Sequence, residues 1–122
     1  MELLPKITQI AIVLVGLIHV GLAIGEIFFG AWLLEKRFDF PEEIAAQSDP
    51  IVKNAGIYNS FIAAGLFWSA FDPTNSTILS IFFLSCVVIA GVFGAITLKW
   101  TTLIIQTIPA IIPLALIWIE NK

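Results

Sequence analysis

Charged residues are scarce in this sequence. Only 12% of its 122 residues are Asp, Glu, Lys or Arg, and 59% are hydrophobic. A soluble domain is about one-quarter charged, so the charged residues present here cannot cover a water-soluble fold. Six bases against nine acids leave no basic patch for nucleic acid, and we expect no nucleic-acid partner. The composition therefore predicts an integral membrane protein, with the lipid bilayer as its surroundings.

Cysteine and histidine each occur once, as Cys86 and His19. A single cysteine excludes a disulfide framework and a CxxC redox pair. One histidine leaves no pair of metal ligands at helical spacing, and the sequence has no glycine-rich phosphate loop. We therefore expect neither a metal nor a cofactor.

Long apolar stretches are abundant by contrast. Four of them reach the roughly 17 to 25 residues that cross a bilayer, namely residues 7–34, 50–71, 77–98 and 101–119. Asp49 and Pro50 resemble a helix N-cap followed by Pro at the first helical position. Short links join the stretches, so residues 1–122 are predicted to form one all-α domain, a transmembrane antiparallel four-helix bundle.

The last stretch contains Pro109 and Pro113, each of which removes a helical hydrogen bond. A kinked last helix is expected. Thr107 or Gln106 is close enough in sequence to satisfy a freed carbonyl, which hydrocarbon would otherwise leave unpaired.

Basic residues suggest an orientation. Four lie near the first and third loops and two near the termini: Lys36, Arg37, Lys53 and Lys99 against Lys6 and Lys122. The positive-inside rule then places both termini outside the cytoplasm in a multi-pass cell-membrane protein.

Small residues at helical spacing predict where helices approach one another. In the third stretch Cys86, Ala90 and Gly94 are four apart. In the second, Gly56, Ser60 and Ala64 show the same spacing. Such residues let helices pack closely in lipid.

The first stretch carries two ionisable residues, His19 and Glu26, which are costly inside hydrocarbon. They are seven residues apart and so return to one helix face within about 20°. Gly16, Ala23 and Gly30 extend this face at a 3-4-3-4 spacing. This small and polar stripe is expected to face the bundle interior.

Depth along the helices predicts what meets the stripe. Four polar residues fall in the same leaflet as Glu26: Asn54, Tyr58, Asn59 and Gln106. Together with His19 they predict a polar cavity that opens toward the first loop and holds a small lipophilic molecule.

Three functions are compatible with such a cavity. An acid–base enzyme of the isomerase, cyclase or epoxide-opening type would use Glu26 and His19 for proton transfer, with the amides and Tyr58 as ligand contacts. A small proton-coupled multidrug-type transporter would use Glu26 and work as a homodimer. A structural or regulatory subunit would use the polar residues only to lock helices together.

Beyond these residues, the chain resembles the small four-helix membrane proteins of the domain of unknown function 1304 family over nearly its whole length. The resemblance rests on His19 and Glu26, and on three segments. These are residues 54–66 (NAGIYNSFIAAGL), residues 83–95 (FLSCVVIAGVFGA) and residues 106–110 (QTIPA). It implies four spans and an interior polar set, and it carries no assigned activity.

Overall fold

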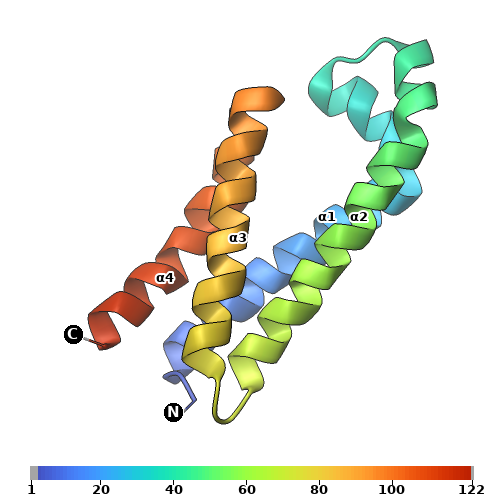
Figure 1. The fold of residues 1–122 in the computed structure, drawn as a ribbon. Coiled ribbons are helices and arrows are strands. Elements are labelled where there is room, and N and C mark those ends of the chain that lie inside the picture. The colour runs from blue at the N-terminus through green and yellow to red at the C-terminus, as the bar shows by residue number, and fades with distance from the viewer. Residues whose placement is uncertain (1–2, 122) are drawn as a thin grey trace.

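The structure, a computed structural model, describes residues 3–121 and is built of antiparallel helices (Figure 1). They are α1 (Lys6–Phe38), α2 (Glu42–Phe71), α3 (Ser76–Thr97) and α4 (Ile108–Glu120), with a π-helical turn, η1 (Leu103–Thr107), leading into α4. The start of α1, the end of α4 and the α2–α3 turn lie at one end of the bundle, which we call the terminal end (Figure 1). The α1–α2 and α3–η1 connections lie at the other, the loop end. The predicted all-α four-helix bundle is confirmed; Lys122 lies outside the described residues.

Three stretches are long and apolar enough to cross a membrane: Lys6–Phe38, Ser76–Thr97 and Leu103–Glu120. Within the described residues α2 is not among them, because its Asn, Ser and Tyr residues lower its hydropathy. It nevertheless makes its most extensive contact with α1 and runs antiparallel to it (Figure 1).

The start of α2 differs from the prediction. The helix begins at Glu42, after Pro41, and continues through Pro50. Pro50 removes only one backbone hydrogen bond, and the turns before it are held by the fully buried Ala45. Asp49 does not cap α2, because its carboxylate binds a backbone amide of α1 instead. The predicted N-cap was wrong.

The last span changes its geometry before Pro109. The amide of Ile108 bonds to the carbonyl of Leu103, five residues back, in the wider turn of a π-helix. The kink predicted for the last helix therefore takes the form of this π turn. Thr107 does not satisfy a carbonyl of its own helix; its hydroxyl donates to the carbonyl of Val88 in α3, at 3.2 Å.

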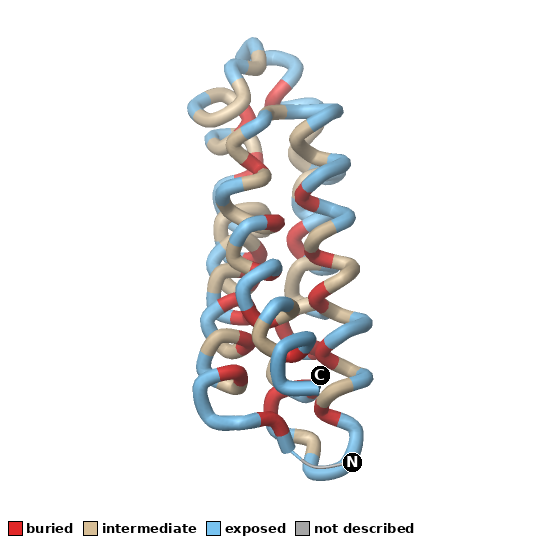
Figure 2. Tube along the Cα trace, turned by 90° about the vertical axis from the view of Figure 1, so that its left-hand side faces the viewer, coloured by how far each residue is buried: buried red, intermediate tan, exposed pale blue. Residues whose placement is uncertain are grey.

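Buried positions recur along all four helices between exposed ones (Figure 2). The apolar core joins residues of every helix: Leu4, Ile12, Val15, Leu66, Ala70, Leu84, Val87, Ala110 and Ile117. The small residues that are buried differ in part from those predicted to lie where helices approach one another. Gly91 is buried in α3 where Ala90 is exposed, and Ala63 is buried in α2 where Ala64 is exposed.

Candidate functional site

The small and polar stripe of α1 faces α2, as its spacing predicts. Gly16, His19, Ala23 and Gly30 are buried, and Glu26 is half-buried. A Cβ added at Gly16 would lie 2.7 Å from the ring of Phe67 in α2. The glycines therefore allow the close approach of two helices in lipid, where packing must replace hydrophobic burial.

Glu26 and Asn59 form the polar contact of this interface. The Nδ2 of Asn59 donates to the Oε1 of Glu26 at 2.5 Å. A Cβ at Gly56 would meet the Cβ of Glu26 at 3.0 Å and the Cγ1 of Ile27 at 2.8 Å, so Gly56 fits between these two residues. This close approach brings α2 near enough for the short side chain of Asn59 to reach the carboxylate.

His19 is 1% exposed, and one of its ring nitrogens is bonded within its own helix. Its Nδ1 lies 2.9 Å from the carbonyl oxygen of Val15. A carbonyl only accepts, so Nδ1 carries the proton. Seven residues separate His19 from Glu26, about 10 Å along the axis. The two ionisable groups therefore share a helix face but do not form a pair.

The other predicted residues lie elsewhere. Asn54 is exposed, and Tyr58 is 62% exposed and stacks edge-to-face on Phe61, with ring centroids 5.8 Å apart. Gln106 lies in η1 beside Gly91 of α3. Of the six predicted site residues, the structure joins Glu26 and Asn59 by a hydrogen bond and buries His19 on the same stripe of α1.

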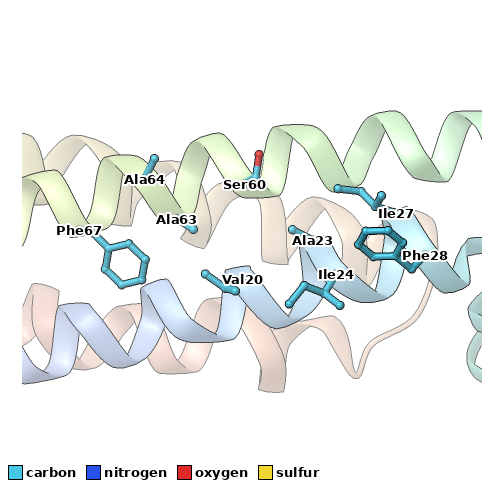
Figure 3. A pocket seen from close by; sticks show the side chains of 9 residues that line it. All are labelled: Val20, Ala23, Ile24, Ile27, Phe28, Ser60, Ala63, Ala64 and Phe67. Carbon is cyan, nitrogen blue, oxygen red and sulfur yellow. The ribbon is translucent and has the colours of Figure 1, made fainter.

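An apolar groove of about 350 Å³ lies between α1 and α2. Figure 3 shows its lining, with Phe67 near one end and Phe28 near the other. The lining residues are Val20, Ala23, Ile24, Ile27, Phe28, Ser60, Ala63, Ala64 and Phe67. None of the six predicted site residues belongs to this set. Ile27, which lines the groove, and Glu26 both lie against Gly56, so the groove and the carboxylate adjoin the same helix contact.

A second hollow of about 360 Å³ lies at the loop end of the same two helices. Its lining residues are Phe28, Phe29, Gly30, Ala31, Trp32, Ala46, Asp49 and Lys53. Phe29 has non-helical angles, φ −134° and ψ 29°, and marks a kink in α1. The Oδ1 of Asp49 accepts the N–H of Ala31 just beyond this kink, at 3.0 Å.

Two further features explain the position of Asp49. A Cβ at Gly30 would lie 2.6 Å from its Oδ1, so only glycine leaves room for the carboxylate. Its Oδ2 forms an ion pair with the Nζ of Lys53 at 2.8 Å. The hydrogen bond from Lys53, aided by that from Ala31, holds the pKa of Asp49 below its usual value.

Sequence reasoning missed both hollows. Their linings are mainly apolar, and apolar side chains carry no signal in a sequence that is apolar throughout. Gly30 and Asp49 were the available signals: Gly30 lies on the predicted stripe, and Asp49 is a capping residue followed by Pro. Among residues 3–121, no three His, Cys, Asp or Glu side chains are grouped so that they could hold a metal ion.

Comparison with known protein families gives a match over most of the chain. The model of the family described as protein of unknown function (DUF1304) matches residues 13–118. No curated protein and no solved structure matches the chain. The matched range contains all of the stripe, both hollows and η1.

Proposed function

Since the chain belongs to the family of proteins of unknown function DUF1304, we propose its function from its own geometry: it binds a small lipophilic molecule between α1 and α2 within the membrane. The groove has the volume and the apolar lining typical of small-molecule sites, which span about 300 to 1,000 Å³. The polar groups of such sites are few, and here the Glu26–Asn59 contact supplies them at the same interface.

The observation that carries this proposal is the hydrogen bond between Glu26 and Asn59. An ionisable group inside a span costs about 2.5 to 3.5 kcal/mol on insertion scales, so its presence favours a function. One amide donor leaves the second carboxyl oxygen of Glu26 able to bind a ligand.

If the bound molecule is also transformed, Glu26 is the group we assign as proton donor or base, and His19 as its counterpart. Because about 10 Å separates them along α1, they would act on different atoms of one ligand. Isomerisation, cyclisation and epoxide opening are reactions of this kind. The other predicted ligand contacts lie farther away: Asn54 and Tyr58 on the exposed face of α2, and Gln106 in η1.

The test compares the lipophilic compounds that copurify with the protein in nanodiscs, identified by mass spectrometry. We expect wild-type protein to carry a compound that Ala64→Phe excludes by filling the groove. Ala90→Phe is the matched control, because Ala90 is also exposed but lies on α3, outside the groove. Equal loading of both variants would refute binding in the groove.

Glu26→Gln separates binding from chemistry. Gln can still accept the hydrogen bond of Asn59, so we expect the compound to remain bound while any turnover stops. Unchanged turnover would remove Glu26 from the acid–base role. A pH-driven flux of an organic cation into proteoliposomes, carried by a dimer and abolished by Glu26→Ala, would replace this proposal with proton-coupled transport. An empty wild-type groove would favour a structural or regulatory subunit.

We also propose that the termini face the outside of the cell. Lys99 donates to the carbonyl of Arg37 at 2.8 Å, so the basic residues of the first and third loops gather at one end. This supports assigning the loop end to the cytoplasm. Labelling of a cysteine placed at Asn121, in a background with Cys86→Ala, should occur from outside intact cells; labelling only after permeabilisation would reverse the orientation.

A further inference from the structure

The apolar groove and the second hollow adjoin at the loop-end side of the groove. Both include Phe28 of α1. On α2, their lining residues recur three, four or seven positions apart, with Ala63 beside Ala64, and so follow one face of the helix: Ala46, Asp49, Lys53, Ser60, Ala63, Ala64 and Phe67. We call the two hollows together the α1–α2 trough.

The trough extends from the hydrocarbon to the head-group level. Lys53 precedes Asp72, at the opposite end of α2, by 19 residues, which corresponds to about 29 Å of helix. The hydrocarbon layer is about 30 Å thick, so with Asp72 at one surface Lys53 reaches the other. Trp32 lines the same end of the trough and is 57% exposed. Tryptophan is enriched at the membrane–water interface, where the head groups lie.

The polar end of the trough has hydrogen-bond donors to spare. Both oxygens of Asp49 are engaged, one by the amide of Ala31 and one by Lys53. The ammonium of Lys53 has three N–H donors, and its side chain is 47% exposed. A ligand that reaches this end therefore meets the remaining N–H donors of an ammonium whose charge is partly offset by Asp49, beside an aromatic ring.

From this arrangement we propose that the trough binds an anionic phospholipid, with an acyl chain in the apolar groove and the phosphate on Lys53. This inference rests on the proposed function and specifies its ligand class. Lys53 supplies a half-exposed ammonium with N–H donors left for a phosphate, and the length of α2 supplies the match between acyl chain and head group. The orientation proposed above would place Lys53 in the cytoplasmic leaflet, where anionic lipids are concentrated.

The test uses the fluorescence of Trp32 in full-length protein whose other tryptophans are changed to Phe. The protein is reconstituted in vesicles containing either brominated phosphatidylglycerol or brominated phosphatidylcholine, both of which quench nearby tryptophan. We expect phosphatidylglycerol to reach half-maximal quenching at about a five-fold lower mole fraction, the factor that one basic residue near the surface contributes. Lys53→Gln should abolish this preference, and Lys53→Arg should keep it.

Lys36→Gln is the matched control, because Lys36 is exposed near the loop end but does not line the trough. It should leave the preference intact. A preference lost equally in both glutamine variants would reveal a diffuse surface charge and overturn the proposal. Equal quenching by the two lipids in the single-tryptophan protein would also overturn it.

The acyl-chain part is tested separately by Ala64→Phe in the same background. It should weaken quenching by both lipids, whereas Lys53→Gln should affect only phosphatidylglycerol. If Ala64→Phe changes neither lipid but still excludes the copurified compound, the groove holds a different molecule: the phospholipid proposal then fails while the proposed function stands.

Discussion

The two ends of the bundle use glycine in different ways. At the terminal end glycines receive aromatic rings: Phe67 lies against Gly16, and Phe83 lies against Gly65. These contacts surround an apolar core to which all four helices contribute. The terminal end is therefore closed by side-chain packing.

At the loop end, two glycines receive polar side chains. The carboxylate of Asp49 lies against Gly30, and the hydroxyl of Thr107 lies against Gly91. Both of these polar side chains bond to the backbone of the neighbouring helix. The loop end is thus held by hydrogen bonds between helices, at the two places where the helical backbone departs from α geometry.

This difference teaches where the chain can accommodate a ligand. Packing between rings and glycines leaves little space, because protein interiors are close-packed, and the apolar groove ends at Phe67, the ring that packs on Gly16. A kink stabilised by a neighbouring carboxylate leaves backbone and side chains apart, and the second hollow forms there. The hydrogen bonds between helices at the loop end keep the second hollow open and its lining ordered.

The largest effect is expected from a substitution in the apolar core at the terminal end. Leu84 is fully buried in the core, so Leu84→Ala should reduce the free energy of unfolding by about 2 to 5 kcal/mol. Ile24→Ala, at a 50% exposed position in the groove, should change it by about 0.5 kcal/mol or less. Unfolding in bicelles measures both; equal losses would show that the groove is as tightly packed as the core.

A smaller effect compares a glycine from each end. A Cβ at Gly91 would overlap the side chain of Thr107 and lie 2.8 Å from its backbone nitrogen, so α3 and η1 must separate. Gly91→Ala should cost about 1 to 3 kcal/mol. Gly65→Ala should cost less, because it meets only the ring of Phe83, which can turn.

Gly21→Ala is the control for both substitutions. Nothing lies within 4 Å of a Cβ at Gly21, and alanine favours helix. The variant should be neutral or slightly more stable in the same unfolding assay. If Gly65→Ala is the costlier of the two test variants, the aromatic contacts are the rigid ones and the comparison of the ends is reversed.

The smallest effect concerns the link between Asp49 and the kink. Because hydrogen bonding lowers the pKa of Asp49, its stabilising contribution is full above the ordinary pKa of Asp, about 3.9. The contribution is lost as the pH falls through the lowered value. Hydrogen exchange should show the amide of Ala31 protected near neutral pH and less protected in acid, after correction for intrinsic rates.

Two variants separate the parts of this link. Asp49→Asn keeps an acceptor for the amide of Ala31 without a titrating group, so protection should persist and lose its pH dependence. Asp49→Ala should remove protection at every pH. Protection that survives in Asp49→Ala would show that the kink needs no partner from α2.

Helical spacing predicted part of the candidate site. It identified the stripe of α1 because residues at a 3-4-3-4 spacing all lie on one face of a helix, and that face must be the one that contacts a neighbouring helix. It could not choose between adjacent polar residues of α2. Depth along the axis is nearly the same for Tyr58 and Asn59, but about 100° of rotation separates them. Asn59 reaches Glu26 while Tyr58 is exposed.

The sequence by itself determined the membrane environment and the helical architecture. With so few charges and such long apolar stretches, the chain fits only helices, which hydrogen-bond their own backbone groups in lipid. It also determined which face of α1 is buried. Only the tertiary structure decided the rotation of α2, the continuation of its helix through Pro50 and the place of the hollows. Each of these depends on contacts between residues far apart in the chain, such as Asp49 with Ala31, and no local pattern encodes the angle at which two helices meet.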